Sequence, residues 1–277
     1  MTQQPDGSVP MRIDLASSEI EGGDYISWVD PEQVIACVAA ARPRSSFARY
    51  LEPRLADLDA SLGAGTEGGS GLPPRVRTLL LRLRQAHARI FRENQLGAQE
   101  PRSVRLAVAV VEEGRTYFLK ATRCWIFLLR DGSAQQVGPE PEAGVEGAET
   151  RGLGSTDRMS VAVTSVDVHP NDVVVLIAAE TGEGVNHRAV TRVFEQSVDL
   201  KRACDGLVNL FGLCSSGAGA VAMRFVPVGQ GGIPANGNSI LRDIAQDLVV
   251  DSRDAFPIRE AGARSNREAE AGSDRET

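Results

Sequence analysis

The sequence predicts an α+β sandwich, in which helices pack on the outer faces of antiparallel sheets. β-Branched and aromatic runs of strand length occur in blocks, and segments with helical periodicity separate these blocks. Short turns that contain Gly or Asp join neighbouring runs, as in β-hairpins. A doubly wound parallel sheet would need strands and helices to alternate one by one, so the block order favours the sandwich.

The strands are predicted from apolar runs bounded by turn residues. Between Met11 and Ala41 we expect two of them, with Asp30–Gln33 as the turn between strand pieces. Glu112–Gly114 and Arg130–Gly132 are hairpin turns further along the chain. The expected strands are Met11–Ser17, Val34–Ala41, Val104–Val111, Thr116–Ala121, Cys124–Leu129, Ser160–Val168, Asp172–Ala179 and Ala218–Val228.

The helices are predicted from caps and from apolar residues at helical spacing. Ser45 or Ser46 can cap a helix that reaches about Leu62, and Asn186 can cap another, since side-chain oxygens of these residues accept from the first free N–H groups. The expected helices are 45–62, 73–94, 186–196, 200–213 and 239–250. Together these elements suggest a single domain over residues 11–250, with a flexible Gly-, Glu- and Pro-rich insertion at about 136–155. Residues 1–10 and 251–277 are expected to be disordered.

The composition excludes several classes of function. The net charge of -7 argues against general binding of nucleic acid or of an anionic membrane, and no apolar run has the length of a membrane span. The N-terminus has no secretion signal, and the four cysteines lie far apart in apolar runs, as expected for buried thiols in the cytoplasm. The three histidines share no metal-ligand spacing, which makes a zinc enzyme a poor interpretation.

The segment from Pro73 to Asn94 carries six arginines beside an apolar stripe. The stripe is formed by Val76, Leu79, Leu80, Leu83 and Ile90. The simpler interpretation of the arginines is a solvated face of a packed helix. The alternative is a surface that docks a phosphoprotein or another acidic partner.

Several segments resemble the protein phosphatase 2C (PPM-type) family. Thr116–Gly132 is similar to that family's paired strands, of which the second ends in Arg-Asp-Gly, as it does here. Ser165–Ala179, Asn186–Phe211 and Ala218–Val228 follow in the family's order and spacing. The resemblance covers residues 11–228 and implies an α-β-β-α sandwich with two central antiparallel sheets flanked by helices. In that family, acidic side chains hold two Mg²⁺ or Mn²⁺ ions, which activate water for attack on phosphoserine or phosphothreonine.

Most of the family's metal motifs are altered in this sequence. Ala40-Ala41 stands at the Asp-Gly motif, so a methyl group replaces the carboxylate that would bridge the metals. Ser216-Gly217 stands at the Asp-Asn motif, and Arg123 lies at the Gly-Asp-Ser-Arg motif. The phosphate-gripping arginine expected before the Asn-Glu-Asp motif has no counterpart in Glu19–Gly22.

Two carboxylates are weak candidates for metal ligands. Asp24, in Gly23-Asp24-Tyr25, falls where the family has Glu, while Tyr25 replaces the Asp of the same motif. Glu180, followed by Thr181, stands at the Ser/Thr-Asp-Gly motif. Two acids of this kind can hold one ion weakly through waters, but not a catalytic pair.

The sequence therefore suggests a degenerate member of the family, a pseudophosphatase that binds rather than hydrolyses. We expect no cofactor, and as partner a phosphoprotein, a kinase or an active phosphatase. One alternative is an active Mg²⁺- or Mn²⁺-dependent phosphatase with a rearranged site that uses Asp24, Glu180 and one of Asp167 and Asp172. The other is a structural subunit of a larger assembly, which the arginine helix and the charged tail would contact.

Overall fold

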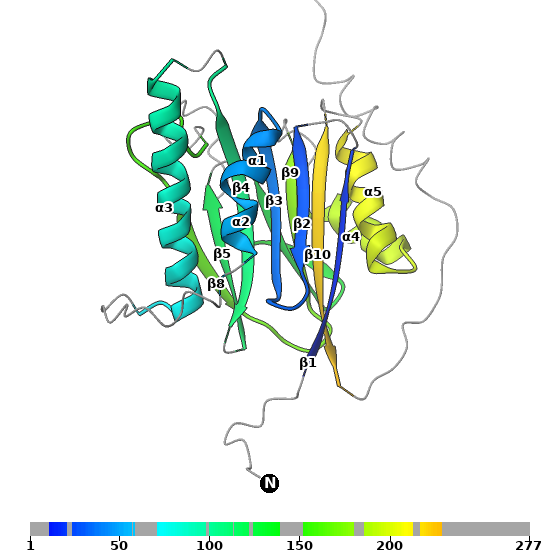
Figure 1. Ribbon diagram of the computed structural model, residues 1–277. Helices are drawn as coiled ribbons and strands as arrows, with labels where there is room; N and C mark the ends of the chain where they lie inside the picture. The colour runs from blue at the N-terminus through cyan, green and yellow to red at the C-terminus, as the bar shows by residue number, and fades with distance from the viewer. Residues whose placement is uncertain are drawn as a thin grey trace, which may run out of the picture.

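The protein is a four-layer sandwich in which two antiparallel five-stranded sheets lie between two layers of helices (Figure 1). This computed structural model describes residues 11–20, 24–56, 58, 71–97, 100–112, 114–121, 124–138, 152–179, 186–212 and 217–228. The α+β sandwich predicted from the sequence is confirmed. Among the described residues, no helix combines the length and the apolar character needed to cross a membrane.

Each sheet is covered by its own helices. Sheet A has the order β1 (Met11–Glu19), β10 (Ala218–Pro227), β9 (Val173–Ala179), β6 (Trp125–Arg130) and β7 (Ser133–Gln136). Sheet B has the order β2 (Tyr25–Asp30), β3 (Ile35–Arg42), β4 (Ser103–Glu112), β5 (Arg115–Ala121) and β8 (Ala162–Asp167). The helices on sheet B are α1 (Ser45–Tyr50), α2 (Glu52–Leu55) and α3 (Pro74–Gln95), and those on sheet A are α4 (His187–Gln196) and α5 (Leu200–Gly212).

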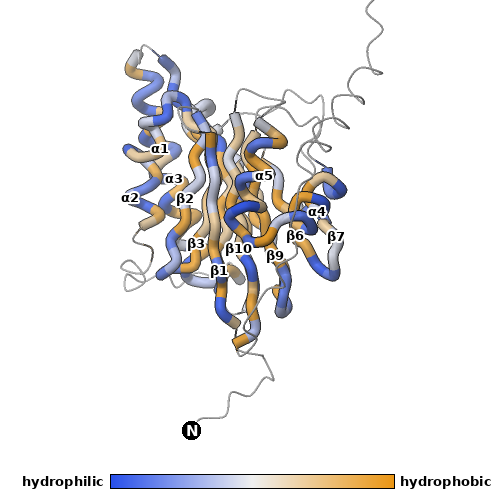
Figure 2. The backbone as a smooth tube through the Cα atoms, turned by 90° about the vertical axis from the view of Figure 1, so that its right-hand side faces the viewer, coloured by the Kyte–Doolittle hydropathy of each residue, from blue (hydrophilic) through white to orange (hydrophobic). Residues whose placement is uncertain are grey.

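The apolar residues form three cores, because successive side chains of a strand point to opposite faces of its sheet. In β3, Ile35, Cys37, Ala39 and Ala41 face the helices, whereas Ala36, Val38 and Ala40 face sheet A. In β9 and β10 the same alternation divides the residues between α4 and α5 on one side and sheet B on the other. Figure 2 shows the hydrophobic stretches running through the strands, while hydrophilic residues recur along the helices. We call the core between the sheets the inter-sheet core.

Two edge strands were not predicted. The structure has three strands between Met11 and Arg42 instead of two, because Tyr25–Asp30 forms β2. Ser133–Gln136 forms β7. Both strands lie at an edge of their sheet and are mostly only partly buried, so their sequences lack the apolar pattern of an interior strand.

The helix predicted from Ser45 or Ser46 to Leu62 was wrong in its extent. Helix α1 begins at Ser45 without a side-chain cap and ends at Tyr50, and α2 covers only Glu52–Leu55. Pro53 lies in the first turn of α2. Because proline has no N–H to donate to the preceding turn, it favours a new helix start over continuation of the old one.

The other predicted elements within the described residues are confirmed with small shifts of their ends. Asn186 caps α4, where its Oδ1 accepts from the Ala189 N–H at 2.9 Å. Asp131 and Gly132 both have positive φ, at 51° and 73°, as a two-residue hairpin turn between β6 and β7 requires. Cys37, Cys124 and Cys204 are buried free thiols, as expected. The helix predicted at 239–250, most of the insertion and both termini lie outside the described residues.

Two arginine–aspartate pairs lie where β8 ends and where β9 begins. Asp172, 2% exposed, accepts from Arg130 Nε at 3.0 Å and from Arg130 Nη2 at 2.7 Å, and its Oδ2 also accepts from the His169 N–H at 2.7 Å. Asp167 pairs with Arg115, but both of these side chains are at least half exposed. The buried pair fastens β6 to the start of β9, whereas the exposed pair lies in water.

The difference in burial gives a prediction for stability. Asp172→Ala leaves Arg130 and a backbone N–H without their buried acceptor, so we expect the free energy of unfolding to fall by about 3–5 kcal/mol. Asp167→Ala serves as the matched control and should lower the free energy of unfolding far less, because an exposed ion pair contributes little to stability. Urea unfolding measures both changes. An equal loss of unfolding free energy in the two variants would show that the burial of Asp172 does not strengthen its ion pair.

Candidate functional site

One end of the sandwich brings together three described residues at the positions of the altered motifs, namely Tyr25, Ala40 and Gly217. At this end β3, β5 and β9 finish, while β2, β4 and β10 begin, which places it at the top of Figure 1. Tyr25 is the cross-strand partner of Ala40, and Ala40 is in turn the partner of Arg105. Across the gap, Gly217 directly precedes the first residue of β10. We call this region the site end.

The ring of Tyr25 fills the space between the sheets at the site end. Tyr25 is 2% exposed and Ala40 is 5% exposed, and both belong to the inter-sheet core. A Cβ atom added at Gly217 would lie 2.8 Å from Tyr25 Cδ2, which is closer than real Cβ contacts allow. The Tyr25 ring therefore occupies the space that a side chain at position 217 would need. Through this ring, three of the altered positions, Tyr25, Ala40 and Gly217, lie in contact.

Two cationic side chains share this face of sheet B. Arg105 alternates with Val104 and Leu106, which point to the helices, and therefore faces sheet A next to Ala40. Lys120, the partner of Ala107, faces the same way by the same alternation. Sequence reasoning missed both residues. A signal existed, because Lys120 is one of only two lysines in the chain and interrupts an apolar run.

The charges of these cations reach the inter-sheet core. Burial raises the pKa of the Cys124 thiol to about 12, while Arg105 and Lys120 oppose that rise. The thiol therefore stays protonated at neutral pH and is no nucleophile. Burial likewise raises the pKa of Cys37 and of Cys204.

A network outside the inter-sheet core holds β2 against β1 at the site end. Glu19 of β1 accepts from the Ser27 N–H at 2.7 Å and forms an ion pair with Arg44. Arg44 also donates to the backbone carbonyl of Tyr25 at 3.0 Å. Glu19 and Arg44 thus fix the backbone that carries the tyrosine ring, and they join an edge of sheet A to an edge of sheet B.

The candidate ligand Asp24 is placed on the surface. Its carboxylate pairs with Arg42 at 3.0 Å, and the two side chains are 42% and 55% exposed. It is the next residue, Tyr25, whose side chain enters the inter-sheet core. Ala41 faces the helices and lies outside the inter-sheet face. The remaining predicted positions, Arg123, Glu180, Thr181 and Ser216, lie outside the described residues.

The two other acids considered for a rearranged site lie at the opposite end. Asp172 directly precedes β9, and the strand extends for roughly 20 Å before it reaches the site end at Ala179. Asp167 ends β8, whose first residue is the one near the site end. Both carboxylates are already paired with arginines. Neither can join Asp24 in one metal site.

The described residues at the site end do not fit a pair of divalent cations. Mg²⁺ and Mn²⁺ need several oxygen ligands, and carboxylates also offset the mutual repulsion of two such ions. The inter-sheet face instead presents a phenol ring, a methyl group and two cations. Across the described part of the chain, no group of three or more His, Cys, Asp or Glu side chains has a geometry that could hold a metal ion.

Comparison with known proteins shows the fold. No family model and no curated protein matches the sequence. PppA, a key regulatory component of the T6SS in Pseudomonas aeruginosa, matches with a TM-score of 0.65 and 18% identity over 78% of this chain and 99% of PppA. The catalytic domain of the serine/threonine phosphatase PstP, in complex with two manganese ions, matches with a TM-score of 0.62 and 14% identity over 78% of this chain and 100% of that domain.

A third match has the same fold. The PPM Ser-Thr phosphatase MsPP from Mycobacterium smegmatis, solved in complex with cacodylate, has a TM-score of 0.56 and 18% identity over 77% of this chain and 97% of MsPP. Identities this low establish a shared fold and leave the activity of this chain open.

The contact between Gly217 and Tyr25 can be tested by a double-mutant cycle. Gly217→Ala places a methyl group against the ring, so we expect it to lower the free energy of unfolding by about 1–3 kcal/mol. In a Tyr25→Leu background the same change should cost clearly less, because the ring is gone. Urea unfolding of the four proteins provides the coupling. A cost that is the same in both backgrounds would mean that the ring does not fill this space.

Proposed function

We propose that this chain, whose described residues have the fold of the PPM-type phosphatases, is a binding or regulatory module of serine/threonine phosphorylation signalling and not a hydrolase. The observation that carries the proposal is the lining of the site end. Tyr25, Ala40, Arg105 and Lys120 form the inter-sheet face there, and among the described residues no group of three or more His, Cys, Asp or Glu side chains could hold a metal ion.

The chemistry of hydrolysis explains why this lining matters. In a metal-dependent phosphatase, bound cations generate the nucleophile and stabilise the charge that develops on the phosphoryl group. Alanine offers no side-chain oxygen, and Arg105 and Lys120 repel any cation placed beside them. Two features of the site end therefore disfavour a dinuclear metal centre. Carboxylate ligands are missing at Tyr25 and Ala40, and the positive charges of Arg105 and Lys120 repel metal cations.

The same residues let the fold close without metal ions. A buried group of acids would be unstable without cations to offset its charge. Here the ring of Tyr25 and the alanines of β3 complete an apolar core, and the Glu19–Arg44 pair fastens the sheet edges. The result is a stable sandwich whose surfaces are available for a phosphoprotein, a kinase or an active phosphatase. The description of PppA as a regulatory component supports such a role for this fold.

An assay of metal-dependent hydrolysis tests the proposal. We expect no release of phosphate from an aryl phosphate or from a phosphoserine peptide in Mn²⁺ above the rate that remains in a chelator. An active PPM phosphatase in the same buffer is the positive control. Asp24→Ala and Glu180→Ala are the decisive variants for any activity that does appear. Mn²⁺-dependent turnover that both substitutions abolish would refute the proposal.

A further inference from the structure

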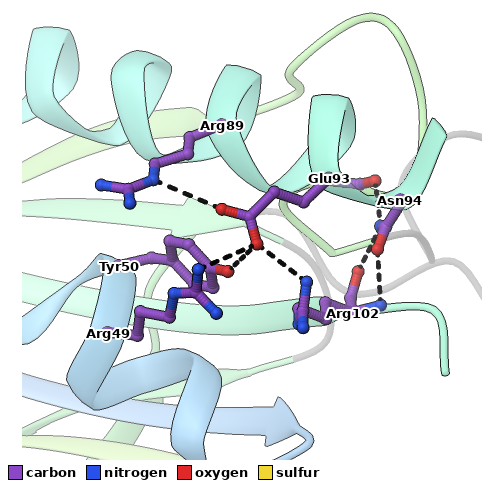
Figure 3. A network of polar contacts seen from close by, with 7 residues as sticks. Arg49, Tyr50, Arg89, Glu93, Asn94 and Arg102 are labelled. Atoms are coloured by element: carbon purple, nitrogen blue, oxygen red, sulfur yellow. Dashed lines mark hydrogen bonds and ion pairs between the residues drawn. The ribbon is translucent and has the colours of Figure 1, made fainter. Parts of the chain in front are cut away.

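The helices over sheet B gather arginines around one carboxylate. Glu93 of α3 accepts a hydrogen bond from the Tyr50 hydroxyl and another from Arg102 Nη1 at 2.8 Å. Arg89 Nε lies 3.4 Å and Arg49 Nη2 lies 3.5 Å from the same carboxylate. In Figure 3 these side chains converge on Glu93 from α1, α3 and the segment before β4. We call Arg49, Arg89 and Arg102 with Glu93 the arginine cluster.

The cluster has more positive charge than its carboxylate can balance. Three arginines and one glutamate leave a net charge of +2, in a chain whose overall net charge is -7. The hydrogen bond from Tyr50, followed by the charges of Arg49 and Arg102, lowers the pKa of Glu93, which is therefore ionised at neutral pH. Further cations lie close by, since the pKa of Arg54 is lowered by burial, the larger cause, and then by the charges of Arg89 and Arg82.

Fold stability depends on only part of the cluster. Tyr50 is fully buried, and the side chains of Glu93 and Arg102 are 21% and 26% exposed, so these three join α1, α3 and β4. The side chains of Arg49 and Arg89 are 53% and 52% exposed, and ion pairs that are this long and this exposed to solvent contribute little to stability. A contact with a binding partner explains these two arginines better than fold stability does.

Arg49 and Arg89 are nevertheless held in place. Their guanidinium carbons lie 5.1 Å and 5.5 Å from the centre of the Tyr50 ring, within cation–π distance. Glu93 accepts a hydrogen bond from Arg89 Nε and forms an ion pair with Arg49. Two positioned and half-exposed guanidinium groups offer N–H donors of the kind that phosphoryl oxygens accept. A short anionic segment fits better than a long polyanion, because a long ligand would extend beyond the cluster along a chain whose overall net charge is -7.

We propose that Arg49 and Arg89, positioned by Tyr50 and Glu93, dock a phosphorylated acidic segment of a protein partner. Arg102 directly precedes β4, which begins at the site end, so a docked segment would lie on the helix side of that end. The docking site shares no residue with the inter-sheet face. It can therefore bind a partner whether or not the site end holds metal.

Fluorescence anisotropy with the full chain tests the docking site. The probe is a short labelled peptide with one phosphoserine flanked by glutamates, and the competitors are its unphosphorylated parent and a single-stranded oligonucleotide of equal charge. We expect the phosphopeptide to bind, the affinity to fall with added salt, and both competitors to displace it poorly. Arg49→Gln with Arg89→Gln should weaken binding about tenfold or more.

Matched variants separate docking from general charge. Arg202→Gln removes an exposed arginine of α5, on the opposite helix layer, and should leave the affinity unchanged. Arg49→Lys with Arg89→Lys keeps the charge but loses the planar fork, so it should bind clearly more weakly than the original chain. Thermal unfolding checks that these exposed substitutions leave the fold intact. Full affinity in either double variant, or equal binding of the oligonucleotide, would overturn the proposal.

Discussion

Stacked sheets must fill the space between them along the whole length of their strands, because an unfilled gap loses both apolar burial and packing contacts. In this protein the ring of Tyr25 meets that requirement at the site end. It packs against Ala40 on its own sheet and occupies the space that a side chain at position 217 would need. Ala40, the Glu19–Arg44 pair that holds the Tyr25 backbone, and Gly217 just before β10 all lie around this residue.

Closing the gap with an aromatic ring has chemical consequences. Three of the positions that resemble metal motifs, Tyr25, Ala40 and Gly217, converge in space, yet they meet as a phenol, a methyl group and a glycine. Arg105 and Lys120 make the same face cationic, which suits anions and disfavours divalent metals. The two acids at the far end of the sandwich are bound to Arg115 and Arg130 and are not available to replace the missing ligands. The packing and the proposed loss of hydrolysis thus have a common origin.

The sequence was sufficient for the interior of the fold. Strands such as β4, β5 and β9 carry continuous apolar runs, and α3 carries an apolar stripe, so burial could be inferred from pattern alone. The edge strand β2 was missed because pairing on one side leaves its residues half exposed. Its omission mattered, since β2 carries Tyr25.

The composition of the site end was predicted only in part. The losses at Tyr25, Ala40 and Gly217 could be found by resemblance, because each stands in a recognisable order along the chain. Arg105 could not, because its place beside Ala40 depends on the register of β3 against β4, which no local pattern specifies. Likewise, the convergence of Arg49 and Arg89 on Tyr50 requires the packing of α1 against α3.

We propose that the site end does not hold two divalent cations, and equilibrium binding of Mn²⁺ tests this proposal. A titration followed by the paramagnetic resonance of free Mn²⁺ counts bound ions without any need for catalysis. We expect no saturable site for Mn²⁺ on the full chain at neutral pH. Saturable binding of two ions per chain, lost when Glu180 is changed to Ala, would contradict it.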